Sequence, residues 1–180
     1  MVASISARAS AAAAIAYYDH LKADSYYTSD REPPGRWMGK AAERLSLHGP
    51  VVESEFEAAL AGRDPKTGQS LTRQHVQDHA AGWDMTYSAP KSVSVLWALS
   101  DETERQVIIA AHQAAVATAV HQLERTAAFT RRGSAGKVRE ATAGLLVAAF
   151  DHHTSRESDP QLHPPCFVFN FEPRHAKIGR

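Results

Sequence analysis

Three histidines near the end of the chain are the residues best suited to metal chemistry. His152, His153 and His163 fall within twelve residues, and the segment between the last two is polar. His152 would close one strand and His163 would open the next, so strand pairing would bring both imidazoles within reach of one ion. Because neutral imidazole is a common ligand of divalent metals, one interpretation is a metal site. The other is a polar hairpin turn with solvated histidines.

Two pairs of adjacent tyrosines near the N-terminus are the candidate nucleophiles. Tyr17-Tyr18 and Tyr26-Tyr27 are nine residues apart and include four of the five tyrosines in the chain. A phenol has a pKa near ~10 and is a good nucleophile at neutral pH only beside a base or a cation. In this interpretation the second pair is a spare nucleophile. The alternative is that the tyrosines pack as amphipathic aromatic side chains at the edge of the core.

An aspartate inside a predicted strand is a further candidate. Residues 82–88 read Gly-Trp-Asp-Met-Thr-Tyr-Ser, and strand alternation places the apolar and aromatic side chains on one face. Asp84, Thr86 and Ser88 share the other face. Aspartate is disfavoured in strands, so Asp84 needs a specific reason to be there.

A basic loop with two glycines follows the longest predicted helix. Residues 130–137 read Thr-Arg-Arg-Gly-Ser-Ala-Gly-Lys. Arg131, Arg132 and Lys137 could contact phosphates at a hairpin tip, since Arg and Lys contacts to the backbone drive nucleic-acid affinity. A solvated turn is an equally good interpretation of the same residues.

The composition narrows the class of protein. The chain has 180 residues, 43% of them hydrophobic, which fits one domain spanning residues 1–180. Its formal net charge is zero, so nucleic-acid binding would depend on local basic patches. A single cysteine, Cys166, excludes an internal disulfide and fits a reducing compartment. The alanine-rich run at residues 11–16 is too short for a membrane span and lacks the basic flank of a signal peptide. We therefore expect a cytoplasmic protein without a membrane partner.

The hydrophobic pattern predicts a mixture of strands and helices. Strands are expected at residues 1–6, 82–88, 138–141, 144–151 and 166–171. Helices are expected at residues 9–21, 37–45, 52–61 and 101–125. Residues 91–99 begin a helix or a further strand. This order predicts an α+β fold, in which an antiparallel β-sheet carries the histidines and helices pack on one of its faces.

The motifs, taken in their order along the chain, resemble one protein family. The tyrosine pairs come first. Residues 82–94 then read Gly-Trp-Asp-Met-Thr-Tyr-Ser-Ala-Pro-Lys-Ser-Val-Ser, and residues 152–163 fit His-x-Thr-Ser-Arg-x-x-Asp-Pro-x-Leu-His. This set is similar to the relaxase domain of the MobF conjugative relaxases, the TrwC/TraI type, within the HUH endonucleases. The resemblance runs to about Asn170 and implies a palm-like relaxase fold.

The resemblance implies a DNA nickase that acts through tyrosine. Relaxases of this type cut one strand of plasmid DNA at an origin of transfer, and the tyrosine becomes joined to the 5′ phosphate. A later transfer step closes the strand again. The matching positions are Tyr17 for the first nucleophile and Tyr26 for the second transfer, with Tyr18 and Tyr27 as supporting neighbours.

The resemblance also implies roles for Asp84, His152 and His163. Asp84 would accept the phenolic proton or fix a histidine tautomer, and the sequence leaves both roles open. His152 and His163 match the first two histidines of the family's metal triad. A divalent ion there, Mg²⁺, Mn²⁺ or Zn²⁺, would polarise the phosphate oxygens.

The third metal histidine of the family is absent from this chain. The family reads Leu-His-Thr-His where residues 162–165 read Leu-His-Pro-Pro, and proline cannot ligate a metal. Strand alternation should point Cys166 to the opposite face and His153 away from His152, so neither is expected to replace the missing ligand. We therefore expect metal binding to be weak or lost.

Two hypotheses about function follow. The first is a conjugative relaxase domain that nicks and transfers single-stranded origin-of-transfer DNA in plasmid mobilisation, with relaxosome accessory proteins as candidate partners. The second is a catalytically impaired remnant that at most binds single-stranded DNA. Domains of the family run on past the point where this chain stops, so we expect a C-terminally incomplete relaxase domain.

Overall fold

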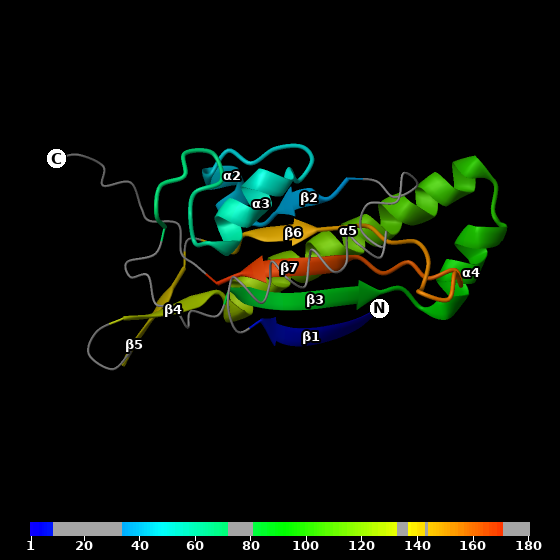
Figure 1. Ribbon diagram of the computed structural model, residues 1–180. Helices are drawn as coiled ribbons and strands as arrows, with labels where there is room; N and C mark the ends of the chain where they lie inside the picture. Colours follow the sequence, from blue (N-terminus) through cyan, green and yellow to red (C-terminus); the bar gives the residue numbers. More distant parts are fainter. Residues whose placement is uncertain (9–33, 72–80, 133–136, 143, 171–180) are drawn as a thin grey trace.

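The computed structural model describes residues 1–8, 34–71, 81–132, 137–142 and 144–170 (Figure 1). These residues form a five-stranded sheet in the order β1-β3-β7-β6-β2 and a separate two-stranded ribbon, β4-β5. Neighbouring strands are antiparallel throughout. The strands are β1 (Val2–Arg8), β2 (Arg36–Met38), β3 (Gly82–Ser88), β4 (Phe129–Arg132), β5 (Val138–Ala141), β6 (Val147–Ala149) and β7 (Pro165–Phe169). The described helices are α2 (Lys40–Arg44), α3 (Glu53–Leu60), α4 (Lys91–Leu99) and α5 (Glu102–Ala127).

Strand β7 is the centre of the sheet. It pairs with β3 along one edge and with β6 along the other. Its five residues read Pro-Cys-Phe-Val-Phe, and all five are buried. A strand that is covered on both faces needs a continuous apolar run, and this sequence provides one.

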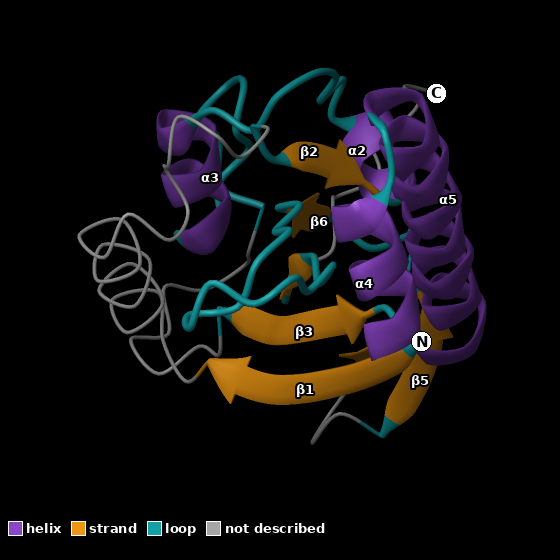
Figure 2. Ribbon diagram, turned by 90° about the vertical axis from the view of Figure 1, so that its right-hand side faces the viewer, coloured by secondary structure: helices purple, strands orange, loops and turns teal. Residues whose placement is uncertain are grey.

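Helices cover both faces of the sheet, so the prediction that they pack on one face is wrong. Phe167 and Phe169 of β7 pack against α3 and against the buried alanines of α2. Cys166 and Val168 point the other way, toward Val116 and Val120 of α5. Figure 2 shows α3 and α5 on opposite sides of the sheet. The predicted α+β class with an antiparallel sheet is confirmed.

Helix α5 is a single long helix along one side of the molecule (Figure 1). It starts where the Asp101 side chain accepts a hydrogen bond from the Glu104 backbone N–H, which supplies one of the otherwise missing partners of the first turn. Arg105 donates to the carbonyl oxygens of Trp97 and Ala98 at the end of α4. The corner between α4 and α5 is therefore fixed by side chains at both helix ends.

Two boundaries differ from those predicted. Residues 37–45 were expected as one helix, but Trp37 lies in β2, opposite Ala148, and the helix is limited to α2. Gly39 separates the two elements at φ 87°, a left-handed conformation that ends the strand. Residues 144–151 were expected as one strand, but only Val147–Ala149 pair as β6. The residues after Ala149 leave the regular ladder and carry the histidines.

None of the helices in the described ranges is long and apolar enough to cross a membrane.

Candidate active site

His152 and His163 lie side by side at one end of the central strands. His152 follows β6, and His163 precedes β7. The backbone N–H of His163 donates to the carbonyl of His152 at 2.9 Å, which continues the hairpin beyond the regular strands. The two imidazole rings are 5.4 Å apart between centroids and perpendicular to each other. The pairing of neighbouring strand ends thus brings these two rings together.

The rings of His152 and His163 can each offer a nitrogen lone pair to a metal ion. Burial, followed by the neighbouring His163 and His153, lowers the pKa of His152 to about 3, so its ring is neutral at physiological pH. The Nδ1 atom of His163 lies 2.9 Å from the carbonyl oxygen of Gln161. A carbonyl can only accept, so Nδ1 carries the proton and a neutral His163 has its lone pair on Nε2. A backbone partner of this kind orients many metal-binding histidines.

Helix α4 holds the segment between the two histidines. The Ser94 hydroxyl is completely buried and accepts a hydrogen bond from the backbone N–H of Leu162 at 3.0 Å. Lys91 donates to the carbonyl of Pro160 at 3.1 Å. The ring of Trp97 packs on that of His153 at 5.1 Å between centroids. His153 therefore packs on α4, whereas the rings of His152 and His163 face each other.

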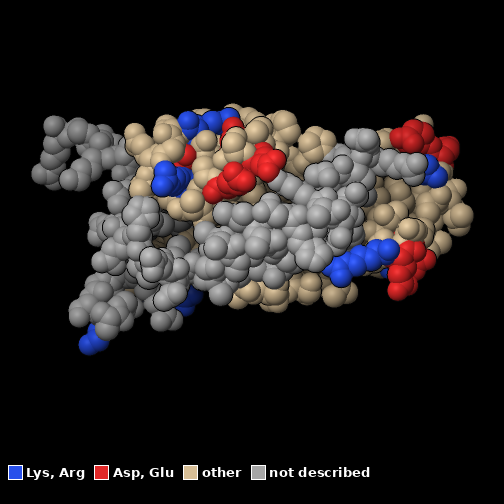
Figure 3. Space-filling view, viewed as in Figure 1, with Lys and Arg blue, Asp and Glu red and all other residues tan. Residues whose placement is uncertain are grey.

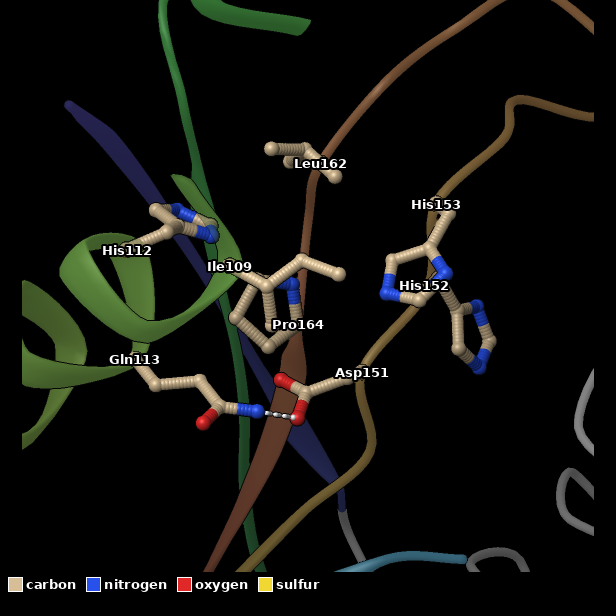
Figure 4. Close-up of a pocket in the computed structure, with 8 residues that line it drawn as sticks. All are labelled: Ile109, His112, Gln113, Asp151, His152, His153, Leu162 and Pro164. Atoms are coloured by element: carbon tan, nitrogen blue, oxygen red, sulfur yellow. Dashed lines mark hydrogen bonds between the residues drawn. The ribbon is translucent and has the colours of Figure 1, made fainter. Parts of the chain in front are cut away.

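Sequence reasoning missed Asp151, the residue before His152. Its carboxylate is buried, forms an ion pair with Arg36 of β2 and accepts a hydrogen bond from Gln113 of α5 at 2.7 Å (Figure 4). One sequence signal could have identified Asp151. It directly follows an apolar strand, where an aspartate is seldom buried without a partner. Its partners are 115 and 38 residues away in sequence, so no local pattern could identify them.

Asp84 lies in β3 on the sheet face that packs against α3. It is opposite Phe167, and Thr86 is opposite Pro165, so Pro165 is the diagonal neighbour of Asp84 on that face. Diagonal neighbours have Cα atoms about 7–8 Å apart. Asp84 is nearly buried, at 9% exposure. The predicted alternation is confirmed, because Trp83, Met85 and Tyr87 belong to the apolar cluster of the α5 face.

The third metal ligand has no substitute among the described residues. Cys166 points to the α5 face, as predicted, and burial raises the pKa of its thiol to about 12. Pro165, where the resemblance led us to expect the third histidine, lies on the face of Asp84. Within the described ranges, no three His, Cys, Asp or Glu side chains are grouped closely enough to hold a metal ion.

Tyr17, Tyr18, Tyr26 and Tyr27 lie outside the described residues. The segment that contains them, residues 9–33, connects β1 to β2. It follows β1, whose Ser6 lies opposite Asp84. It precedes β2, whose Arg36 pairs with Asp151.

The predicted basic loop connects the two strands of the β4-β5 ribbon, which extends from one end of the molecule (Figure 1). Arg131 and Arg132 end β4, and Lys137 precedes β5 and is exposed. Arg139 lies over the ring of Phe129 at 3.9 Å, a cation–π contact across the ribbon. On the face of the molecule in Figure 3, the described acidic and basic side chains are interspersed, in keeping with the zero net charge.

An antiparallel sheet whose neighbouring strand ends bring two buried histidines together, with an aspartate on the adjoining strand, is the architecture expected of a relaxase. The chain belongs to the TrwC relaxase family, whose model matches residues 11–177. It is 40% identical to the multifunctional conjugation protein TraI of Escherichia coli over 139 residues. This match covers 75% of the chain and 8% of TraI, so the chain spans less than a tenth of that relative. The resemblance to MobF relaxases is confirmed.

Solved structures of the conjugative relaxase TrwC have the same fold. A copper-bound complex of TrwC with oriT DNA is 36% identical to this chain, with a TM-score of 0.74. It covers 99% of this chain, which spans 60% of the TrwC chain. A complex with a 27-mer DNA, comprising the recognition hairpin and the cleavage site, has a TM-score of 0.73 and 34% identity.

Proposed function

We propose that this domain is a conjugative relaxase that nicks one strand of origin-of-transfer DNA and holds the 5′ phosphate on a tyrosine. The observation that carries the proposal is the pair of buried imidazoles of His152 and His163, whose ring centroids are 5.4 Å apart. The similarity to TraI, and to TrwC in complex with oriT DNA, supports the same activity. Since plasmid DNA is in the cytoplasm, the reaction would take place there.

In this proposal Tyr17 is the first nucleophile. Its phenolic oxygen attacks the scissile phosphorus, the bond from phosphorus to the 3′ oxygen breaks, and the 3′ oxygen leaves as a hydroxyl after taking up a proton. Asp84 is the candidate acceptor of the phenolic proton. Tyr26 carries out the second transfer, with Tyr18 and Tyr27 beside the two nucleophiles. Arg36, which follows residues 9–33 closely, pairs with Asp151 beside His152, and this contact supports the assignment.

His152 and His163 are the candidate ligands of a divalent ion. The neutral ring of His152 and the ring of His163, whose tautomer is fixed by a backbone carbonyl, fit such an ion, and imidazole donors suit Zn²⁺ better than Mg²⁺. TrwC has been solved in metal-bound and metal-free forms with oriT DNA. A bound ion would supply positive charge to the phosphate oxygens. With Pro165 in the third position, we expect its affinity to be low.

Arg131, Arg132 and Lys137 are the candidate contacts to the DNA backbone. They flank the loop of a protruding two-stranded ribbon, a shape that fits a groove of a DNA hairpin. The partner is therefore single-stranded origin DNA with a folded segment. Accessory proteins of a relaxosome are further candidate partners.

The second candidate function is a remnant that binds single-stranded DNA without cutting it. Pro165 is the observation that favours it, because a triad with one ligand missing holds its ion poorly. Both candidates predict DNA binding, so only a covalent product separates them.

The test is to trap the covalent adduct between protein and DNA. Single-stranded oligonucleotides spanning an origin of transfer, including the 27-mer sequence solved with TrwC, are incubated with Mn²⁺ or Mg²⁺ and separated under denaturing conditions. We expect an adduct that is lost in Tyr17→Phe and retained in Tyr26→Phe. Tyr87→Phe is the matched control, because Tyr87 is buried on the α5 face. If the adduct is lost in Tyr26→Phe but not in Tyr17→Phe, the assignment of the first nucleophile is wrong. If no adduct forms even in Pro165→His, the domain is the remnant that binds DNA without cutting it.

A further inference from the structure

We infer that Gln113, on α5, is a positioning residue for His152 and acts through the carboxylate of Asp151. The inference deepens the proposed function and rests on it, because His152 matters only if the histidine pair takes part in the reaction. The assignment comes from the contacts of one buried carboxylate.

Asp151 joins three separate parts of the fold. Its Oδ2 atom accepts the hydrogen bond from Nε2 of Gln113 at 2.7 Å and also pairs with the Arg36 guanidinium. Gln113 comes from the helix on one side of the sheet, and Arg36 comes from the edge strand β2. Figure 4 shows the amide of Gln113 pointing at the carboxylate. The side chain of Asp151 is only 10% exposed, so solvent cannot replace a lost partner fully.

The next residue along the chain is His152, and its surroundings are fixed by the same backbone. Asp151 turns toward α5, while the His152 ring turns toward His163. The carbonyl of His152 accepts the N–H of His163 at 2.9 Å, so a shift of one backbone moves both rings. Ligand geometry tolerates displacements of only about 0.5 Å. A carboxylate held from two sides therefore sets the distance and angle between the two imidazoles.

Helix α5 also offers a matched control. Gln106 lies seven residues before Gln113, which places it on nearly the same side of the helix. It is exposed and donates to Glu102 at 2.7 Å within the same helix. Replacement of either glutamine by alanine favours the helix slightly, so loss of helix is not a competing cause. The two variants differ in whether the amide reaches the histidine hairpin.

The experiment observes the two rings directly in the metal-free, DNA-free protein by ¹H–¹³C NMR of histidine-labelled samples. The ring signals are assigned with single His→Gln variants. In the parent, the centroid distance of 5.4 Å should give a cross-peak between the rings of His152 and His163. We expect Gln113→Ala to shift the His152 signals and to weaken or abolish this cross-peak. Gln106→Ala should reproduce the parent spectrum, and Gln113→Lys, which keeps a donor for Asp151, should retain the cross-peak.

Each outcome decides the inference without any measurement of nicking. An unchanged His152 signal and cross-peak in Gln113→Ala would overturn it, as would equal changes in Gln106→Ala. If Gln113→Ala no longer melts cooperatively, Asp151→Asn provides the second variant. It keeps the shape of the side chain but removes its charge, and it should shift the same His152 signals. Failure of the domain to form a tyrosine adduct would contradict the proposed function but would leave this result intact.

Discussion

Pro165 lies directly opposite Thr86 and is the diagonal neighbour of Asp84 on the same face of the sheet. It is also two residues after His163, so strand alternation gives positions 163 and 165 the same side. Position 165 therefore lies between the histidine pair and the carboxylate. A side chain with a donor atom there could contact both.

The substitution Pro165→His should strengthen binding of Mn²⁺ or Zn²⁺. A third imidazole completes a ligand set that now has two, and it can donate its other N–H to Asp84. We expect the metal affinity to rise by about 10–100-fold or more, because loss of a single outer-shell partner already changes the affinity by that factor. Calorimetric titration of the metal-free protein measures it. Pro164→His adds the ring on the opposite face and should give no gain; equal gains in both variants would contradict the geometry.

Ser94→Ala should destabilise the fold through the histidine hairpin. The substitution leaves the buried N–H of Leu162 without its acceptor, which costs about 1–3 kcal/mol. Ser92→Ala, at an exposed position of the same helix, should change the free energy of unfolding by less than about 0.5 kcal/mol. Denaturant melts of both variants provide the comparison. Similar losses in both would show that the hydroxyl of Ser94 contributes nothing specific.

Gly39→Ala should cost more stability than Gly49→Ala. Both glycines have φ near +85°, so either substitution carries a strain of about 1 kcal/mol. Only at Gly39 would the new Cβ meet a backbone atom, since it would come within 2.2 Å of the Leu145 carbonyl oxygen. The difference between the two denaturation free energies isolates this clash, and we expect it to exceed about 1 kcal/mol. If both variants lose the same free energy of unfolding, Leu145 can move away from the new Cβ at position 39 without loss of stability.

Stability should fall in alkaline solution because of Cys166 and Tyr87. Burial raises the pKa of both groups to about 12. Their folded-state pKa exceeds the unfolded value, so the stabilisation is complete below about pH 9 and is lost as pH rises toward 12. The unfolding free energy should decrease by about 1 kcal/mol per pH unit from Cys166 alone. Denaturant melts from pH 7 to 11 measure the slope, and Cys166→Ala should reduce it; an identical slope in that variant would be the contrary result.

Lys137→Ala should weaken DNA binding in a salt-dependent way. Each lost phosphate contact lowers the slope of log affinity against log salt by about 1. Fluorescence anisotropy with a labelled origin hairpin at several salt concentrations gives the slope. Lys66→Ala is the control, because Lys66 pairs with Glu55 of α3 and is not part of the ribbon. If the salt slope is the same as that of the parent in both variants, residues 130–137 form a solvated turn that does not contact the DNA.

The parts of the site that could be predicted depend on local patterns. Strand alternation alone placed Asp84 on a separate face from Trp83, and the spacing of His152 and His163 brought their rings together. The Asp151 contacts could not be predicted, because Arg36 and Gln113 come from remote elements. Strand β2 was missed for a similar reason. Its three residues form a strand only because β6 pairs with them, and their own sequence continues the pattern of the helix that follows.

The position of β7 in the sheet has a consequence for biosynthesis. Of the described strands it is the last to leave the ribosome, yet it is the one that joins β3 to β6. Until it arrives, β1-β3 and β2-β6 can form only two separate half-sheets, each with an open edge. Folding must therefore wait for the C-terminal part of the chain, and the half-sheets are exposed to aggregation in the meantime. A nascent chain arrested before Pro165 would contain most of the residues discussed here and still be unable to assemble the sheet that positions them.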